Sequence, residues 1–261
     1  SSLVNAYTGQ VHAWHVDGTP LSGWPKTLEG TVRSSPVLVD LDGDGSFEVL
    51  VGCDDHRVYA WHADGTPVAG WPQATTGTVG STLAVADLDP GTPGVEVIAS
   101  SWDRRVYAWH ADGTPVAGWP QEVTVALGNN SPAIADVDRD GFSEVIFGTE
   151  RNLPTVENYG EVYVLNRAGR PFSDSWPLVY DSIVFGPVNS FALADFAGDA
   201  RLEILTVPSY INPPYPYDPR LYTWFFAWQD GGASVPGFPA FQWDRPGGGW
   251  RRPTGSPWLS G

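Results

Sequence analysis

Positive charge is scarce in this chain. Its 261 residues hold 14 Lys and Arg against 30 Asp and Glu, a net charge of −16 at pH 7, and Lys26 is the only lysine. Proteins that bind DNA or RNA neutralise phosphates with clustered Lys and Arg. The composition therefore argues against a nucleic-acid partner and against an anionic membrane surface. The sequence also lacks the run of about 18 apolar residues that a bilayer-spanning helix needs, so we expect no membrane insertion.

Cysteine and helical periodicity are missing as well. Cys53 stands alone, which excludes an internal disulfide and a cysteine-ligated zinc site, and we expect it to pack as a small apolar residue. No stretch of about ten residues places apolar side chains three and four positions apart without Gly or Pro inside. Instead, short apolar runs are bounded by Asp, Gly and Pro, which is typical of strands. The sequence therefore predicts an all-β fold.

What the chain has in abundance is repetition. The stretch RVYAWHADGTPVAGWPQ occurs at residues 57–73 and again, letter for letter, at residues 105–121. Looser copies begin at residues 10, 161 and 225, and a second segment, of the type SPVLVDLDGDGSFEVLVG at residues 35–52, recurs between them. A period near 50 residues indicates stacked or radial units, none of which can bury its apolar face alone.

Each unit is expected to hold four strands. In the first full unit, strands a to d cover residues 35–41, 47–53, 57–63 and 67–73. Asp64-Gly65 is a two-residue hairpin signal, because Asp-Gly suits the positive φ angles of a tight turn. Pro67 suits an outer edge strand, where a missing backbone donor does little harm. Four strands per unit, with aromatic residues at fixed positions, predict a β-propeller of four-stranded blades.

We expect the chain to be a single domain, residues 1–261, built of successive blades. The first residues align with the b strand of a blade, and the last six align with an a strand, so we expect the two ends to share a composite blade. The ring then has five blades; alternatively, these residues are part of a seven- or eight-bladed ring or of a longer polypeptide. The expected blades are residues 241–261 with 1–26, 27–73, 74–121, 122–179 and 180–240.

Tryptophan and histidine recur at fixed places in the copies. Recurrence in near-identical copies is what a structural role predicts, so we expect these tryptophans to pack between blades. The histidines are not expected to form a metal triad, because each lies in a different blade. The tryptophans are Trp14, Trp24, Trp61, Trp71, Trp109 and Trp119, and the histidines are His15, His62 and His110.

The loop between strands a and b carries the pattern with the clearest chemistry. Carboxylates stand at positions 1, 3, 5 and 9, where their oxygens can point inward together, and glycine follows at position 6. Such carboxylates repel one another without a cation, and Ca²⁺ accepts about six to eight oxygens with flexible geometry. An EF-hand is rejected, because position 12 is Val51 and the flanks are strands. We expect two Ca²⁺ sites, each with a backbone carbonyl ligand at position 7: Asp40, Asp42, Asp44, Ser46 and Glu48; and Asp136, Asp138, Asp140, Phe142 and Glu144.

Two further copies of this loop are incomplete. The second blade has one residue more and no third carboxylate, and the fourth lacks the carboxylate at position 3. We expect both loops to be metal-free or weak. Their acidic residues are Asp87, Asp89 and Glu96 in one, and Asp195, Asp199 and Glu203 in the other.

Together these features resemble a known repeat family. The apolar run into D-x-D-x-D-G-x-x-[DE], followed by a strand and V-Y-A-W-x-x-D-G-T-P, is similar to the FG-GAP or VCBS repeats of integrin-α-like β-propellers. The resemblance covers nearly the whole chain. It implies calcium in the a–b loops on one face, ligand on the opposite face, and a secreted or cell-surface location. It does not fix the ligand, since one fold serves many functions.

The loops between strands b and c differ most among the copies. Two of them expand, to residues 148–160 and 208–220, and both insertions fall on the face away from the metal loops. Tyrosine with stiffening proline suits recognition of an extracellular glycan or protein partner; alternatively, the insertions only pack over the mouth of the propeller. The residues expected to contact ligand are Tyr7, Trp102, Arg104, Tyr159, Tyr210, Tyr215 and Tyr217.

Two classes of function follow. The first is a non-catalytic binding or adhesion module, lectin-like or a structural subunit of an extracellular assembly. The second is a calcium-dependent polysaccharide lyase or hydrolase, or an accessory domain of a secreted enzyme. No nucleophile elbow, phosphate loop or zinc signature is present, so we expect no catalytic residue in this chain. Further domains of the same polypeptide or a larger assembly remain open as partners.

Overall fold

The computed structural model describes residues 8–88, 90–91, 93–124, 127–149, 159–181, 188–195, 198, 201–208, 222–229, 232–233, 235 and 240–243. Within these ranges every regular element is a strand, and there is no helix of the length and apolarity that a membrane span requires. The all-β prediction is confirmed.

The strands form five small antiparallel sheets, in which each strand pairs with its neighbour in the sequence. The first described sheet has two strands, β1 (Gly9–Val11) and β2 (Lys26–Leu28). The next two have four each: β3 (Val37–Val39), β4 (Glu48–Cys53), β5 (Arg57–Trp61) and β6 (Gln73–Ala74), then β7 (Ala84–Ala86), β8 (Glu96–Ser101), β9 (Arg105–His110) and β10 (Gln121–Glu122). The last two are β11 (Ala133–Ala135), β12 (Glu144–Gly148), β13 (Tyr159–Leu165) and β14 (Leu178–Asp181), then β15 (Val188–Ala194), β16 (Glu203–Pro208), β17 (Tyr222–Trp228) and β18 (Ala240–Trp243).

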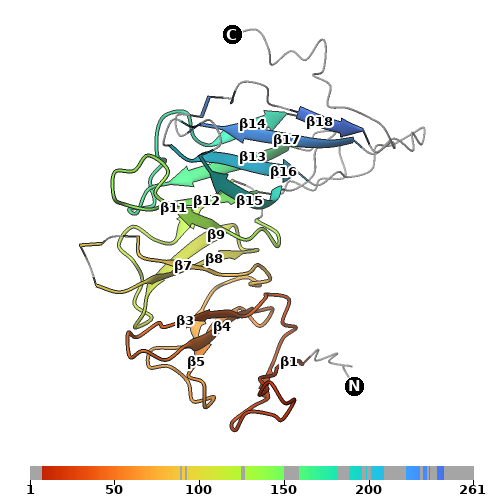
Figure 1. Ribbon diagram of the computed structural model, residues 1–261, viewed down its shortest axis with the longest axis vertical. Helices are drawn as coiled ribbons and strands as arrows, with labels where there is room; N and C mark the ends of the chain where they lie inside the picture. Colours follow the sequence, from red (N-terminus) through yellow and green to blue (C-terminus); the bar gives the residue numbers. More distant parts are fainter. Residues whose placement is uncertain are drawn as a thin grey trace.

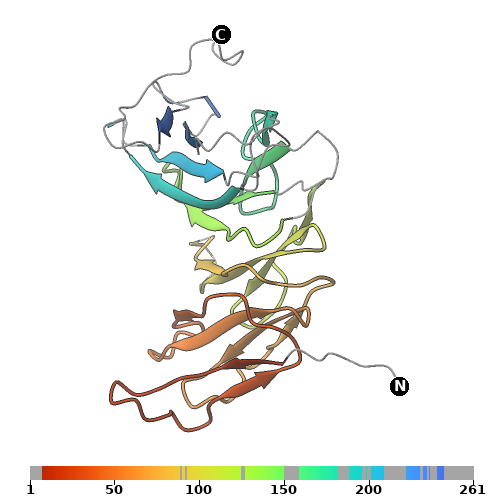
Figure 2. The ribbon, with the colours of Figure 1, turned by 90° about the vertical axis from the view of Figure 1, so that its right-hand side faces the viewer.

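The four-stranded sheets are blades of the propeller type, as predicted. From β1 near one end of the long axis the sheets succeed one another to β7–β10, and the sheets β11–β14 and β15–β18 overlap at the other end (Figures 1 and 2). The predicted composite blade depends on residues 1–7 and 244–261, which lie outside the described residues. The blade number and the closure of the ring therefore stay predictions.

The outermost strand of the blade β3–β6 is shorter than predicted. Strand d was expected over residues 67–73, but Pro67 makes only an isolated bridge to Trp61, and β6 covers just Gln73–Ala74. Pro67 has no N–H to donate to a ladder, and Trp71 N donates to Val68 O (3.1 Å), which bends the chain into a turn. The inner strands were placed correctly to within about two residues at each end.

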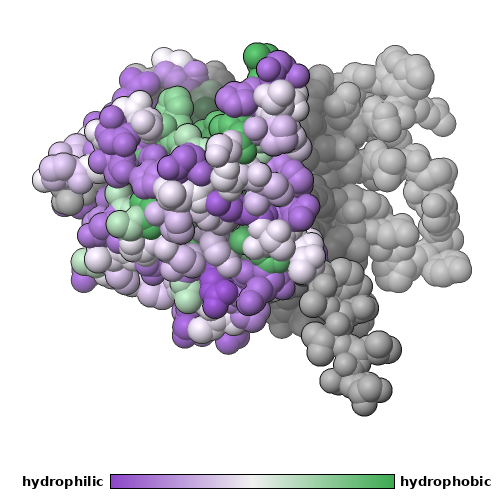
Figure 3. Space-filling model, turned by 90° about the horizontal axis from the view of Figure 1, so that it is seen from below, coloured by the Kyte–Doolittle hydropathy of each residue, from purple (hydrophilic) through white to green (hydrophobic). Residues whose placement is uncertain are grey.

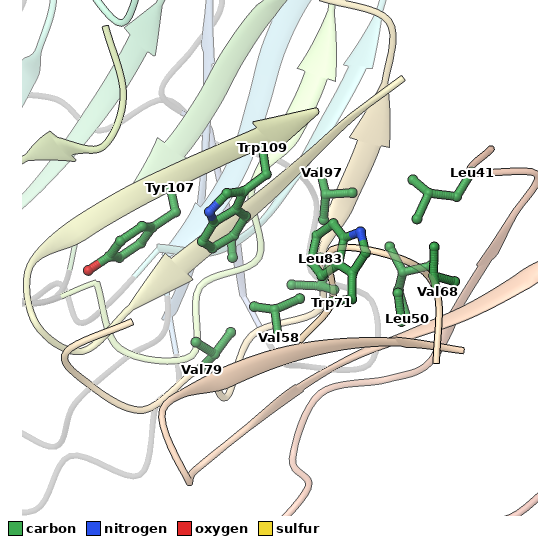
Figure 4. Packing of buried hydrophobic residues seen from close by; sticks show 12 residues of the cluster. Leu41, Leu50, Val58, Val68, Trp71, Val79, Leu83, Val97, Tyr107 and Trp109 are labelled. Atoms are coloured by element: carbon green, nitrogen blue, oxygen red, sulfur yellow. The ribbon is translucent and has the colours of Figure 1, made fainter. Parts of the chain in front are cut away.

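Adjacent blades bury one continuous hydrophobic cluster at their junction. Between the blades β3–β6 and β7–β10, Leu50 and Val58 from one sheet and Val97 from the next surround the indole of Trp71 (Figure 4). Trp71 meets Trp109 edge to face, with ring centroids 6.0 Å apart, a geometry that favours aromatic pairs. The inter-blade role predicted for these tryptophans is confirmed at this junction.

One hydrogen bond recurs at three successive junctions. The indole Nε1 of a tryptophan donates to a backbone carbonyl of the next blade: Trp24 to Ala63 (2.9 Å), Trp71 to Ala111 (2.8 Å) and Trp119 to Arg167 (2.9 Å). Each tryptophan follows a glycine with positive φ: Gly23, Gly70 and Gly118. A Cβ at any of these glycines would collide with the backbone of the next blade, so only glycine permits the close approach. We call each glycine-tryptophan pair with its following proline a corner.

Two of the expected core residues have different outcomes. Cys53 is fully buried, as predicted, and burial raises the pKa of its thiol to about 11. Trp14 does not pack between blades in the described part of the chain: 57% of it is exposed, and its ring stacks on His12 at 5.0 Å. Trp14 occupies the same place in its repeat as Trp61 and Trp109. Trp61, by contrast, is covered by Trp24 of the preceding repeat, which it meets edge to face with ring centroids 5.8 Å apart.

Candidate functional site

The loop between β3 and β4 folds around its own carboxylates. Gly45 N donates to Asp40 Oδ2 (3.1 Å), Asp44 N to Asp42 Oδ1 (3.2 Å), and Ser46 N to Asp44 Oδ1 (2.7 Å). Gly43 and Gly45 take φ values of 76° and 88°, and both have open space where a Cβ would lie. These positive φ angles let a short loop curl so that acidic side chains from alternate positions converge.

The converging carboxylates form a group that could hold a metal ion. Asp40, Asp42 and Asp44 each place one ligand oxygen so that all three lie within 4.8 Å of one another. The Oδ1 atom of Asp40 is buried and has no hydrogen-bond partner among the described residues. A buried carboxylate oxygen without a partner is costly, and a bound cation would satisfy it. The donor set is all oxygen, which fits a hard divalent ion.

Glu48, at position 9 of the loop, also forms hydrogen bonds outside the group of aspartates. Its side chain is fully buried, Oε2 accepts from Leu41 N at 2.7 Å, and Oε1 lies 3.2 Å from His62 Nδ1. The carboxylate therefore ties the start of the loop to strand c. Glu48, Asp42 and His62 also bring ligand atoms within 4.8 Å of one another, so an imidazole stands at the edge of the candidate metal group.

The loop between β11 and β12 repeats this geometry. Gly141 N donates to Asp136 Oδ2 (2.9 Å), Phe142 N to Asp140 Oδ1 (2.8 Å), and Asp140 N to Asp138 Oδ1 (3.1 Å). The ligand oxygens of Asp136, Asp138 and Glu144 lie within 4.8 Å of one another.

The pKa of Glu144 reflects the burial and the charges of this loop. Burial raises the pKa of its carboxyl to about 7; the hydrogen bond from Val137 N opposes the rise, and the neighbouring aspartates Asp138, Asp140 and Asp136 add to it. A bound cation would relieve the repulsion among these crowded carboxylates. The residues present therefore fit a divalent ion in both loops predicted from the spacing. The role of the Ser46 and Phe142 carbonyl oxygens as calcium ligands stays a prediction.

The two incomplete loops are arranged differently. In the second blade, Glu96 is buried and Leu88 N donates to its Oε2 at 2.8 Å, while Asp89 lies outside the described residues. In the fourth, Asp195 Oδ1 accepts from Gly198 N at 2.7 Å, Glu203 is fully buried, and Asp199 lies outside the described residues. The potential metal groups of the described part of the chain all fall in the other two loops.

Sequence reasoning missed the role of two histidines. His62 Nδ1 lies 3.2 Å from Glu48 Oε1, and His110 Nδ1 lies 3.0 Å from Glu96 Oε1. Glu96 and His110 face each other across the ladder of β8 and β9. The signal was present in the sequence, because glutamate and histidine stand 14 residues apart in both copies.

The b–c loops rest on the segments that lead from one blade into the next. Asp54 N donates to Thr31 O, and Trp102 N to Thr78 O, both at 3.0 Å. This contact gathers five residues that we call the Trp102 patch: Arg33, Asp54, Gly80, Trp102 and Asn129. Arg33 Nε lies 2.9 Å from Asp54 Oδ2, and Trp102 Nε1 lies 3.3 Å from Asn129 Oδ1. A Cβ on Gly80 would meet the side chains of both Asn129 and Arg33, so glycine joins the two pairs into one surface.

The predicted ligand residues divide into three groups. Trp102 is 48% exposed and belongs to the Trp102 patch. Arg104 takes a positive φ of 68° and its guanidinium lies 3.6 Å from Glu122, so it makes an exposed ion pair. Tyr159 begins β13, but its side chain is not described. Tyr7, Tyr210, Tyr215 and Tyr217 lie outside the described residues, and their role stays a prediction.

Comparison with known proteins shows no family for this chain. No protein-family model and no curated protein sequence matches the chain, so the FG-GAP or VCBS resemblance also stays a prediction. Among solved structures, the chain is similar to BBS1N in a complex with ARL6DN (12% identity, TM-score 0.47, covering 87% of this chain and 70% of that one). It is also similar to the V. cholerae biofilm matrix protein Bap1 (17%, 0.45, 85% and 41%) and to a europium-containing methanol dehydrogenase (14%, 0.49, 86% and 43%). The chain thus spans less than half the length of the last two.

Proposed function

We propose that this chain is a calcium-stabilised, non-catalytic binding module that acts outside the cell and recognises a glycan or protein through the face of its b–c loops. The observation that carries the calcium part is the buried, unpartnered Oδ1 of Asp40 within a ring of three carboxylates. Calcium suits this ring because it accepts carboxylate oxygens in flexible geometry. The extracellular location is supported by the resemblance of the repeats.

The Trp102 patch is the favoured contact for the ligand. It combines an indole that is half exposed with an arginine, a carboxylate and an amide, all held by hydrogen bonds or ion pairs. A fixed aromatic face can stack on a sugar ring or on a partner's side chain, while the polar groups give direction. Because these groups are already positioned, little conformational entropy is lost on binding.

A glycan array in the presence of calcium tests the ligand. Wild-type protein is expected to bind one class of glycan, and Trp102→Ala is expected to weaken that binding by about tenfold or more. Phe47→Ala is the matched control, because Phe47 is also an exposed aromatic (65%) but belongs to the metal loop. If Trp102→Ala binds normally and Phe47→Ala loses binding, the ligand contacts the face of the metal loops, and the proposal names the wrong face. Should wild-type protein bind no glycan, a glycan ligand is refuted.

A second assay addresses catalysis. Incubation with uronic-acid polymers and calcium is expected to release no unsaturated product, measured by ultraviolet absorbance. Product formation would place the chain among polysaccharide lyases and overturn the non-catalytic proposal.

A further inference from the structure

The two loops that fit a divalent ion differ by one histidine. In the blade β3–β6, one ligand atom each from Asp42, Glu48 and His62 lie within 4.8 Å of one another. In the blade β11–β14, Asn166 stands at the place of His62. Its Oδ1 accepts from two N–H groups of its own turn, at 3.0 and 3.2 Å. The first loop therefore offers a nitrogen ligand beside its carboxylates, whereas the potential metal group described in the other loop is all carboxylate.

The three ligand groups are held in place by the fold. Glu48 begins β4, its side chain is fully buried, and its Oε2 is fixed by Leu41 N at 2.7 Å. His62 follows β5, which pairs with β4, so the imidazole stands at the same end of the ladder as Glu48. Asp42 comes from the loop, where its Oδ1 accepts from Asp44 N at 3.2 Å. Asp42 is exposed and the side chain of His62 is 32% exposed, so an ion can reach the group from solvent.

The kind of ligand atom decides which ion such a group favours. Calcium binds oxygen ligands, whereas an imidazole nitrogen suits transition ions such as Zn²⁺. Zinc takes histidine nitrogen and carboxylate oxygen at about 2.0–2.2 Å, commonly with three protein ligands and a water in the fourth position. Two carboxylates also balance the charge of a divalent ion. Independently of the histidine, the buried Oδ1 of Asp40 has no hydrogen-bond partner among the described residues, which indicates a cation in this loop.

We propose that the loop between β3 and β4 binds Zn²⁺ through Asp42, Glu48 and His62, in competition with Ca²⁺. The two ions exclude each other because Asp42 belongs to both potential metal groups of this loop. Zinc at Nδ1 takes the place of the hydrogen bond to Glu48 Oε1, and the imidazole then carries its proton on Nε2. The inference deepens the calcium part of the proposed function and rests on it only in that both ions use Asp42. The loop between β11 and β12, which has Asn166 in place of the histidine, takes Ca²⁺ alone.

The overall charge attracts cations to this molecule but does not choose among them. The chain carries a net charge of −16, and its described surface is largely hydrophilic when seen from the end that holds the first sheet (Figure 3). An acidic surface raises the local concentration of every divalent cation. The choice between Zn²⁺ and Ca²⁺ is therefore set by the ligand atoms of each loop.

Titration calorimetry of the full chain with Zn²⁺, in a buffer that does not bind metal, tests the proposal. Wild-type protein is expected to bind one equivalent of zinc, and zinc added to calcium-loaded protein is expected to release one of its two calcium equivalents. His62→Asn installs the residue of the blade β11–β14. It is expected to weaken zinc binding by about 100-fold and to keep both calcium equivalents. Wild-type protein that takes up no zinc, or His62→Asn that binds zinc as tightly as wild type, overturns the proposal.

The matched control is His110→Asn. His110 Nδ1 makes the same contact with Glu96 Oε1, at 3.0 Å, but neither residue belongs to a potential metal group in the described part of the chain. This variant is expected to bind zinc like wild type, and an equal loss in the two histidine variants contradicts the assigned site. Should His62→Asn unfold, Asp42→Asn replaces it, because it leaves the buried contact of Glu48 with His62 in place. Asp42→Asn is expected to lose the zinc and one calcium equivalent, and zinc binding that it retains overturns the proposal.

The two metals also separate this inference from the proposed function. Two equivalents of calcium without any zinc refute the zinc site and leave the calcium proposal standing. One equivalent of zinc without any calcium supports the zinc site and refutes the calcium part of the proposed function.

Discussion

The first two complete blades are a natural comparison, because nature has changed one loop and kept most of the rest. Residues 57–73 and 105–121 are identical, yet the preceding loops read DLDGDGSFE at residues 40–48 and DLDPGTPGVE at residues 87–96. Both loops keep the same buried glutamate, which accepts from the leucine N–H and faces the same histidine. Only the first keeps the third aspartate, Asp44, and gathers a potential metal group.

The difference separates two roles that one motif combines. The glutamate at its end joins the loop to strand c whether or not the loop is complete, so its contribution to stability does not require a metal. The aspartates in the middle have exposed side chains in the first blade and serve the loop itself. We infer that the glutamate is retained for folding and that the aspartates decide whether a cation binds.

The largest expected effect comes from removing the glutamate in either blade. Glu96→Ala leaves Leu88 N–H and His110 without their buried partner, and it is expected to lower the free energy of unfolding by about 3 kcal/mol. Glu48→Ala is expected to cost a similar amount in chelator, measured by urea unfolding. A loss below about 1 kcal/mol in both variants would contradict a structural role for the glutamate.

Calcium removal is the next largest effect and should act on one of the two loops only. With calcium at about 100 times its dissociation constant, chelation of one site is expected to lower the free energy of unfolding by about 2.7 kcal/mol. Wild-type protein is expected to bind two equivalents by titration calorimetry, and Asp42→Asn one. The matched variant Asp87→Asn is expected to keep both equivalents. If Asp87→Asn loses one, the second blade binds metal and the contrast between the loops fails.

A smaller effect is expected at the blade junction. Trp71→Phe removes the indole N–H that Ala111 O accepts and reduces the volume of the ring, so about 2 kcal/mol of unfolding free energy is expected to be lost. The control is Trp14→Phe in dilute solution, where the ring is 57% exposed and the change should stay within about 0.5 kcal/mol. Equal losses in the two variants would mean that Trp71 acts through its own blade and not through the junction.

The two blades also show what could be predicted from the sequence. Repetition reveals what is local: the strand order, the Asp64-Gly65 turn and the carboxylates of the first loop all follow from residues that are neighbours in the chain. The contact of Glu48 with His62 joins strands b and c, and the sequence held it only as a repeated separation of 14 residues. The burial of Trp61 under Trp24 of the preceding repeat is likewise a contact between units, which the sequence of one repeat does not encode.

The Trp102 patch could not be predicted from the sequence for the same reason. Trp102 was singled out because its loop varies, but Arg33 and Asn129 come from segments of two other repeats. Their meeting depends on how consecutive blades are stacked, a relation between units that a single repeat does not encode. Residues that vary at one position of an otherwise regular repeat are nevertheless the place to search for such surfaces.

The smallest expected effect compares the b–c loops of the two blades. Asp55 and Asp103 each accept from a tyrosine hydroxyl at 2.7 Å, from Tyr59 and Tyr107. Asp103 Oδ2 accepts in addition from Thr76 N (3.0 Å) and Thr76 Oγ1 (2.6 Å), in the segment that leads from β6 into β7. The residue at the equivalent place before Asp55 is Glu29, and Asp55 Oδ1 is buried and has no hydrogen-bond partner among the described residues.

Asp103→Asn is therefore expected to cost more than Asp55→Asn, by about 1.5 kcal/mol at pH 7. Burial raises the pKa of Asp103, but the hydrogen bonds from Thr76 and Tyr107 outweigh it and hold the pKa below its ordinary value of 3.8. A lowered pKa in the folded state gives stability that is fully present above pH 3.8 and is lost as the pH falls through the folded-state value. The gap between wild type and Asp103→Asn, measured by urea unfolding from pH 7 down to pH 3, should accordingly narrow at the acidic end. If the difference in unfolding free energy stays constant with pH, the charge of Asp103 does not contribute to stability.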